Sequence, residues 1–415
     1  MALFSPETWP FSLDLLPHDA HLVGGSVRDR LLNRTTSYLD LDFVLPKDAI
    51  KTAANLANTY SAGFVVLDKT REIARVIFDT TTVDIVKQQG DTLEADLHRR
   101  DYTINAIAYH PRTHQLIDPL NGQADLKTKT IRTISERNLA ADAVRLLRAY
   151  RQAAQLNFTI APDTQAAIQQ LARKLILVSR ERIQKELDAL LATPTSSRYL
   201  APMLEAQLLK FFLPSFSRDR IQKIQAIEQA IATFQTNLPS YANQLKRWTK
   251  PTPPNHHRSW IKAAKLSQMV SPQPELAEEE LIILKYSRNE IQVIITLLEA
   301  QPQIEAMRQN PLSQAQQFFL FKQVGTYFPA ISLLALAQGV PFTTLQPLIE
   351  RFLNPEDKIA HAPTLITGTE LIQQLKIEPG PQIGAILKAV ESAQAEGRIQ
   401  DKESAIAFIQ QWQNS

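Results

Sequence analysis

The first 135 residues alternate short β-branched runs with stretches of helical spacing. The runs predict strands over residues 21–23, 39–45, 64–67, 74–78, 82–87 and 130–134. Apolar positions recurring at helical spacing predict helices over residues 48–60 and 93–109. This order of elements predicts an α/β or α+β domain built on a small sheet.

The remainder of the chain has a different pattern. No glycine occurs from Gln123 to Val324, although the whole chain has 11 glycines. A long segment without glycine has few left-handed turns, and its richness in Ala, Leu, Gln, Lys and Arg favours helices. Proline-rich breaks punctuate this region, and residues 354–363 resemble a further linker. We therefore predict that everything beyond the first domain is helical.

Composition and charge narrow the class of protein. The 415 residues are 44% hydrophobic and 21% charged, which is typical of a globular chain, and the net charge of +3 is too small to indicate nucleic-acid binding. The absence of cysteine excludes disulfides, thiolate metal sites and cysteine nucleophiles. No basic segment precedes an apolar run at the N-terminus, and the apolar stretch 281–298 is interrupted by Lys285, Arg288 and Glu290. We expect a soluble, cytoplasmic protein without a membrane segment.

A glycine pair follows the first predicted strand. Gly24 and Gly25 stand between an apolar run and a helix start, and Arg28 follows one turn later. Glycine lets backbone N–H groups approach a phosphate, and a helix N-terminus favours an anion. The alternative is an ordinary strand-to-helix turn.

Paired carboxylates follow on the next predicted strand. Asp40 and Asp42 point to the same face of the strand, while Leu41 and Phe43 point to the other. Such carboxylates repel one another unless a cation lies between them, so the pair indicates a Mg²⁺ site for phosphoryl transfer. Asp84, on another predicted strand, is a candidate third carboxylate. The alternative is a solvated polar face.

Two basic motifs come next. Arg99 and Arg100 precede Asp101, which we predict to be the N-cap of a helical segment that opens within residues 99–108, and a basic pair just before a helix N-terminus suits a triphosphate. In the predicted helix over residues 141–151, a basic stripe recurs every third residue, made up of Asp142, Arg145, Arg148 and Arg151. Each motif could also be purely structural, as a capped core helix or a solvated stripe.

The first two members of this stripe suggest a reader for a nucleotide base. Asp142 can accept a hydrogen bond and Arg145 can donate one. Cytosine and adenine present an amino donor beside a ring acceptor, whereas uracil and guanine present the opposite pattern. One rigid pair could therefore select C and A without a nucleic-acid template.

Taken in order, these motifs resemble the class II tRNA nucleotidyltransferase and bacterial poly(A) polymerase family. The similar segments are GGSVRD, DLD, RRDYTINA, NGQADL, ADAVRLLRAYR and SRERIQKEL, which lie within about residues 20–190, and TGTEL and PGP resemble the C-terminal segments of some members. The resemblance implies a polymerase-β-like α+β head at residues 1–137. It also implies an all-α neck at 138–200, body at 201–353 and tail at 354–415.

The resemblance assigns roles residue by residue. It implies that Asp40 and Asp42 bind the catalytic Mg²⁺ and that Asp142 and Arg145 read the base. It further implies contacts with the nucleotide and its triphosphate from Gly25, Arg28, Arg100, Arg148 and Arg151. The sequence departs from the family pattern in two places. Ala141 and Ala143 flank Asp142 where the family often has Glu and Pro. Asn121 stands where the family usually has a glycine.

The implied reaction is attack of a tRNA 3′-hydroxyl on the α-phosphate of CTP or ATP, with release of pyrophosphate. Members that add the full CCA end carry a flexible loop between the Asp-x-Asp strand and the Arg-Arg-Asp helix, and only residues 88–92 separate the elements at 82–87 and 93–99 here. We therefore favour CC addition over full CCA addition. A poly(A) polymerase is a further alternative, which a very basic C-terminal extension would favour, and residues 399–415 are not basic. An inactive RNA-binding module is the remaining alternative.

We expect the helical region to bind the tRNA acceptor arm, and no protein partner can be inferred. The candidate contacts are Lys246, Arg247, Lys250, Arg258 and Lys262.

Overall fold

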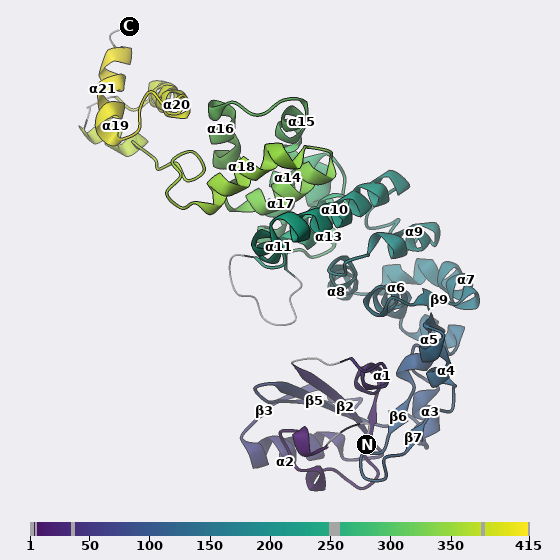
Figure 1. The fold of residues 1–415 in the computed structure, drawn as a ribbon. Coiled ribbons are helices and arrows are strands. Elements are labelled where there is room, and N and C mark those ends of the chain that lie inside the picture. Colours follow the sequence, from purple (N-terminus) through teal and green to yellow (C-terminus); the bar gives the residue numbers. More distant parts are fainter. Residues whose placement is uncertain (1–3, 5, 35–37, 249–257, 375–377, 414–415) are drawn as a thin grey trace. The chain divides into compact units, whose positions relative to one another are not determined.

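The computed structural model describes the chain except for residues 1–3, 5, 35–37, 249–257, 375–377 and 414–415 (Figure 1). It contains two compact units. The first comprises Met1–Leu190 with Glu205–Leu208, and the second comprises Leu191–Leu204 with Leu209–Ser415. The bounds of the four domains expected from the resemblance stay predictions, because the two units are defined by compactness and not by function.

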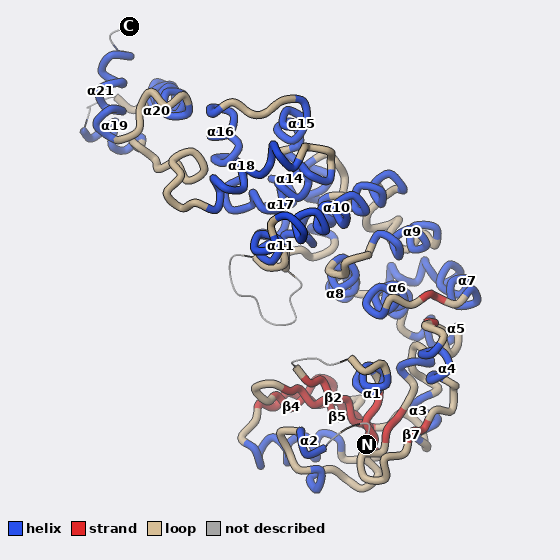
Figure 2. Tube along the Cα trace, viewed as in Figure 1, coloured by secondary structure: helices blue, strands red, loops and turns tan. Residues whose placement is uncertain are grey.

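A mixed sheet forms the core of the first unit (Figure 2). Its strand order is β3-β4-β5-β2-β1-β6-β7, with β2 and β5 parallel and the other pairs antiparallel. The strands are β1 (His21–Val23), β2 (Leu39–Leu45), β3 (Gly63–Asp68), β4 (Ile73–Ile77), β5 (Thr81–Lys87), β6 (Ala108–Tyr109) and β7 (Leu116–Ile117). Five of the six strands expected from the sequence therefore belong to it. The sixth is the two-residue β8 (Thr130–Ile131), which pairs instead with β9 (Thr159–Ile160).

Helix α2 (Ala49–Tyr60) packs on one face of this sheet (Figure 1). Leu41 and Phe43 are buried there, as the alternation along β2 requires. Aromatic side chains of the N-terminal segment join this core, with the rings of Trp9 and Phe11 5.4 and 6.3 Å from that of Phe43. The opposite face of β2 carries Asp40 and Asp42, followed by Val44, which is buried.

The prediction of a helix over residues 93–109 is wrong after Leu97. Helix α3 covers Leu93–Leu97, followed by the 3₁₀ turn η3 (Thr103–Asn105) and strand β6. The backbone after α3 bonds to distant segments, since Thr103 N donates to Arg132 O and Ala108 pairs with Val23. Asp101 therefore caps no helix. Its buried carboxylate accepts from Tyr102 N, Asn105 Nδ2 and Arg148 Nη1.

Helix α4 (Gly122–Lys127) packs so closely on η3 that it requires glycine at its first residue. Asn121 precedes it at φ 56°, the left-handed conformation expected of this substitution for glycine. A Cβ on Gly122 would lie 2.3 Å from Thr103 O and 2.9 Å from Ile107 Cγ1. Backbone and core atoms cannot move away as a flexible side chain could.

We therefore expect Gly122→Ala to lower the free energy of unfolding by about 2 kcal/mol, in the range of overpacked cores. Urea denaturation of the full chain measures it. Gly384→Ala is the matched control, because Gly384 lies within a helix with nothing within 4 Å of an added Cβ, so alanine there should be neutral or stabilising. Equal effects of the two changes would contradict the packing argument.

Helices complete both units. Those of the first unit include α1 (Gly25–Leu31), α5 (Glu136–Ala141), α6 (Val144–Leu156), α7 (Pro162–Leu171), η4 (Ala172–Leu177) and α8 (Arg180–Leu191). Those that follow are α9 (Ser197–Glu205), α10 (Arg218–Asn237), α11 (Pro239–Leu245), α12 (Trp260–Ser267), α13 (Pro274–Ile283), α14 (Arg288–Glu299), α15 (Gln301–Gln309), α16 (Gln314–Val324), α17 (Phe328–Ala337), α18 (Phe342–Leu353), α19 (Gly368–Gln374), α20 (Pro381–Ala395) and α21 (Lys402–Gln413).

The helical run Gln314–Ala337 is long and apolar enough to cross a membrane, by length and composition, among the described residues. Most of its apolar window is buried inside the protein, and its second half, α17, packs against α10 and α12. The core helix of a soluble protein can have the same length and apolar composition, so this run is weak support for a membrane span.

Two lysines are buried in the second unit. Lys265 Nζ donates to Thr193 O at 2.7 Å, Ser196 Oγ at 3.1 Å and Glu228 Oε1 at 2.9 Å. Glu228 also accepts from the backbone of Ser197 at the start of α9, so this network fastens the segment before α9 to α10 and α12.

The other buried lysine is Lys262, which donates to Glu290 Oε1 at 3.0 Å and is 1% exposed. Lys262 therefore cannot contact tRNA in this conformation, and that expectation is wrong. Arg258 also ion-pairs with Glu290, at 3.6 Å. Lys250 lies outside the described residues.

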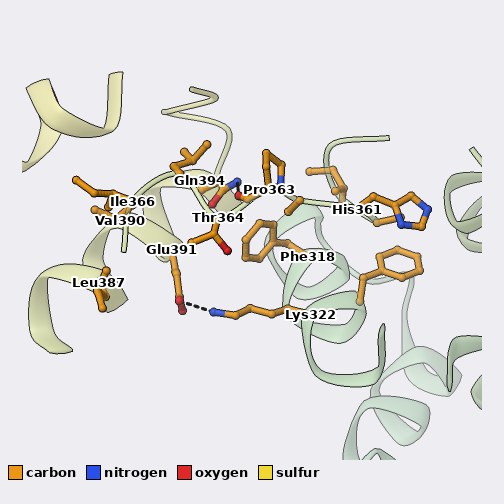
Figure 3. Close-up of a pocket in the computed structure, with 15 residues that line it drawn as sticks. Phe318, Lys322, His361, Pro363, Thr364, Ile366, Leu387, Val390, Glu391 and Gln394 are labelled. Atoms are coloured by element: carbon orange, nitrogen blue, oxygen red, sulfur yellow. Dashed lines mark hydrogen bonds and ion pairs between the residues drawn. The ribbon is translucent and has the colours of Figure 1, made fainter. Parts of the chain in front are cut away.

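The C-terminal helices have a small core of their own, formed by α19, α20 and α21. A pocket of about 260 Å³ lies between α16, α20 and the segment that precedes α19. Figure 3 shows the residues that line it. An ion pair between Lys322 and Glu391 joins α16 to α20 at its rim. All of its lining residues belong to the second unit.

Candidate active site

Charged side chains line up across three neighbouring strands of the first unit. Arg75 on β4 lies opposite Asp84 on β5, and Asp84 lies opposite Asp42 on β2. Asp40 shares the face of Asp42, as the sequence predicts, and accepts from Thr82 Oγ1 at 2.6 Å. Across β2, β5 and β4, this face of the sheet therefore carries three carboxylates and one guanidinium.

The carboxylate of Asp84 is already paired with an arginine. Arg75 Nε and Nη2 donate to its two carboxylate oxygens at 2.7 and 2.8 Å. Both oxygens therefore have a cationic partner, which distinguishes Asp84 from Asp40 and Asp42. No pattern in the sequence identifies Arg75, because the partner follows from strand order.

The electrostatics of the cluster favour a cation. Burial, with the neighbouring charges of Asp40 and Asp84, raises the pKa of Asp42 to about 7, and Arg100 and Arg75 oppose this shift. Among the described residues no three His, Cys, Asp or Glu side chains converge as a complete metal cage. Two carboxylates with open positions suit Mg²⁺, which commonly takes its remaining ligands from water and substrate phosphates.

The raised pKa makes a prediction about stability. A carboxyl that is easier to protonate when folded stabilises the protein below its unfolded pKa, and this contribution is lost as pH rises through about 7. Asn carries no charge, so Asp42→Asn should stabilise the metal-free protein relative to the parent, and the gap should widen by about 2 kcal/mol from pH 5 to pH 8. Chemical denaturation with a chelator present measures it, and parallel pH curves would contradict the assignment.

The glycine pair allows a close approach beside Asp42. Gly24 has φ 77°, and a Cβ there would lie 3.3 Å from Asp42 Oδ2 and 3.5 Å from Arg100 Nη1. Helix α1 begins at Gly25, as expected. Arg28 donates to Asn105 Oδ1 at 2.8 Å and ion-pairs with Asp29 at 2.9 Å, so its guanidinium is held in place.

A cavity of about 430 Å³ opens at this place, lined by four of the expected residues: Gly25, Arg28, Asp40 and Asp42. Sequence reasoning did not single out its remaining polar and aromatic walls. They include Phe4, Thr8, Trp9, Arg30, Arg34 and Tyr38. A local motif could not have shown that the N-terminal aromatic residues lie beside the carboxylates, since their placement is tertiary.

The helix expected over residues 141–151 is interrupted at Asp142, which the sequence predicts to read the base. Asp142 lies between α5 and α6 in an extended conformation, with φ −145°, and α6 begins at Val144. Its carboxylate accepts from Arg182 Nη2 at 2.7 Å. Burial alone would raise the pKa of Asp142, but Arg182 and Arg145 outweigh it and lower the pKa, so the group is an ionised acceptor at neutral pH.

Two guanidinium groups carry buried donors without partners. Arg145 Nη1 donates to Arg99 O and Asn138 O, and Arg100 Nη2 donates to Asp96. The Nε of Arg145 and of Arg100 is buried and finds no acceptor within the described parts of the chain. An unpaired buried donor costs free energy. An acceptor supplied by a ligand would therefore stabilise either arginine.

Arg148 and Arg151 are not a solvated stripe. Arg148 bonds to Asp101 at 3.1 Å and to Glu186 at 3.4 Å. Arg151 donates to the other oxygen of Glu186 at 2.5 Å. The structure thus brings both side chains inward, where acidic partners hold them.

A mixed sheet that carries Asp-x-Asp beside a glycine pair and a basic helix defines a nucleotidyltransferase. Family models agree along the chain. They match the poly A polymerase head domain at residues 20–132, the probable RNA and SrmB-binding site of polymerase A at 157–219, and tRNA nucleotidyltransferase domain 2 (putative) at 254–409.

Similar proteins identify the family more specifically than these models do. The CC-adding tRNA nucleotidyltransferase of Synechocystis sp. is 41% identical over 97% of this chain and 95% of its own, and the A-adding enzyme of Deinococcus radiodurans is 31% identical over 95% and 96%. This chain belongs to the tRNA nucleotidyltransferase family, and the α+β head with helical remainder is confirmed.

Solved structures support the fold. A CCA-adding enzyme in complex with ATP matches with a TM-score of 0.70 at 21% identity, covering 95% of this chain and 90% of that chain. The Thermotoga maritima CCA-adding enzyme complexed with tRNA matches with a TM-score of 0.66 at 22% identity, covering 94% and 90%. These matches show the fold, and the 41% and 31% identical relatives show that the chain belongs to a family of enzymes.

Proposed function

We propose that this enzyme adds two cytidines to the 3′ end of tRNA, using CTP and releasing pyrophosphate. The observation that carries the proposal is the 41% identity, nearly end to end, to a CC-adding relative. The A-adding and CCA-adding relatives are 31% and 29% identical, and two further CC-adding relatives are 27% identical. A cytoplasmic location follows from the substrates, since tRNA and nucleoside triphosphates meet there.

The short connections in the head support CC addition. Residues 88–92 are pinned between β5 and α3, because Gln89 N donates to Asp96 Oδ1 and Thr92 caps the helix. Residues 69–72 form a tight turn between β3 and β4, where Arg71 N donates to Asp68 and Glu72 ion-pairs with Lys87 at 2.6 Å. Neither connection has the length to reshape a base pocket from cytosine to the larger adenine.

The residues have complementary tasks in the transfer. Asp40 and Asp42 would hold Mg²⁺, which polarises the attacking and leaving oxygens when bound. Gly25 lets backbone approach the nucleotide, and Arg28 and Arg100 would contact its phosphates. Asp84 remains a candidate third carboxylate, with Arg75 holding both its oxygens. Catalysis in this arrangement is mainly positioning and electrostatics.

The base would be read by hydrogen bonding alone. Asp142 would accept from the cytosine N4 amino group, and the unpartnered Nε of Arg145 would donate to N3 or O2. Arg148 and Arg151 would neutralise the triphosphate, in exchange for part of their contact with Glu186. Uracil would place its O4 against the carboxylate and is therefore refused.

The product length tests the proposal. With tRNA that ends at the discriminator base, CTP and ATP together should yield a product two nucleotides longer and no more. Efficient addition of the terminal A to tRNA that ends in CC would establish full CCA addition instead, and a ladder of adenylates would establish a poly(A) polymerase. Asp42→Ala is the negative control, in which no nucleotide should be added.

A further inference from the structure

Helix α8 presents opposite charges to the residues that would read the nucleotide. Arg182 and Glu186 are one turn apart on α8 and so share one of its faces. Arg182 binds Asp142, and Glu186 binds Arg148 and Arg151. The acceptor of the reader thus has a cationic partner and the triphosphate arginines have an anionic one, both from a single helix.

The contact to Asp142 restricts how that carboxylate can turn. Arg182 Nη2 lies 2.7 Å from Asp142 Oδ2, and the backbone of Val144 also bonds to this carboxylate. Asp142 lies outside the helices, so no helical backbone holds its side chain in one direction. Without Arg182 only the bond from the Val144 backbone would restrain the carboxylate, whose Cβ–Cγ torsion is intrinsically broad.

We propose that Arg182 is a positioning residue for base selection, which fixes the carboxylate of Asp142 as an acceptor aimed at the cytosine amino group. The proposal rests on the proposed function of the site. A fixed acceptor repels the O4 of uracil, whereas a carboxylate free to rotate can turn away from it. Loss of Arg182 therefore relaxes the choice between CTP and UTP more than it slows transfer of the correct nucleotide.

Glu186 supplies an internal contrast. It contacts two arginines that would meet the triphosphate, and the triphosphate is common to every nucleotide. A change at Glu186 therefore alters KM for CTP and UTP alike and leaves their ratio in place. A purely structural role for α8 would give the same uniform result at Arg182.

The experiment compares kcat and KM for CTP and UTP on tRNA that ends at the discriminator base. In Arg182→Gln, the preference for CTP over UTP in kcat/KM should fall about tenfold, within the range for one misread base contact. Glu186→Gln should leave that preference unchanged, as should Lys185→Gln, a control on an exposed residue of the same helix. Arg182→Lys keeps the charge and should restore part of the preference.

Two outcomes overturn the proposal. One is an unchanged preference in Arg182→Gln. The other concerns the double variant Asp142→Ala with Arg182→Gln. Because Arg182 acts through Asp142, this variant should have the same preference for CTP over UTP as Asp142→Ala alone. A further drop in that preference contradicts the proposal. Should Arg182→Gln unfold, the ratio measured in Arg182→Lys decides. A parent enzyme that does not itself prefer CTP overturns the proposed function as well, whereas a selective parent with a selective Arg182→Gln overturns only this inference.

Discussion

Alanine at Asp40 or Asp42 is expected to reduce nucleotide transfer by about a thousandfold or more, because metal stabilisation of the transition state contributes several kcal/mol. The two carboxylates share one strand face, and unlike Asp84 neither is held by an arginine fork. Each substitution leaves a single carboxylate to hold the ion. Single-turnover transfer of CTP to tRNA measures the loss.

Two controls separate chemistry from folding and binding. Affinity for tRNA should be nearly unchanged, since neither aspartate is needed for contacts with the acceptor arm. Asp79→Ala removes an exposed carboxylate from the connection between β4 and β5 and should retain activity. If both Asp40→Ala and Asp42→Ala keep as much as a tenth of the transfer rate, these residues are not the metal ligands.

Arg145→Ala should relax the refusal of UTP by about 10- to 100-fold, because a reader contact typically contributes about 1–3 kcal/mol against a wrong base. Its buried Nε has no acceptor in the described protein, so this donor is not committed to another protein group. The preference for CTP over UTP in kcat/KM measures the effect. Undiminished refusal of UTP would place base selection elsewhere.

The same side chain also has a structural contact, which the controls must address. Arg145 Nη1 donates to Arg99 O and Asn138 O, so truncation leaves two carbonyls without this donor. The melting temperature of Arg145→Ala shows whether the fold tolerates it. Arg137→Ala removes an exposed arginine from the neighbouring helix α5 and should leave base selection intact.

The sequence predicts the head best where one face of a strand is buried. The alternation from Leu39 to Leu45 defines β2 residue by residue and places Asp40 and Asp42 together. The prediction fails where local spacing competes with long-range pairing. Residues 93–109 have helical spacing, yet Ala108 joins the sheet through Val23 and Thr103 bonds to Arg132.

The site shows the same division. Motif residues were found because each motif is local, and their roles stay predictions. Their partners are tertiary: Arg75 reaches Asp84 through strand order, and Arg182 reaches Asp142 from 40 residues away. Regular spacing also misled the interpretation at Asp142, where the chain leaves the helix although every third residue continues the pattern.

The buried network around Lys265 has a consequence for chemical footprinting. Its amine is fully buried and bonded to Thr193, Ser196 and Glu228, so an acylating reagent reaches it only when the segment before α9 opens. The rate at which mass spectrometry detects acylation at this position would report how often that junction separates from α10 and α12, and a bound ligand that tightens the junction would slow it.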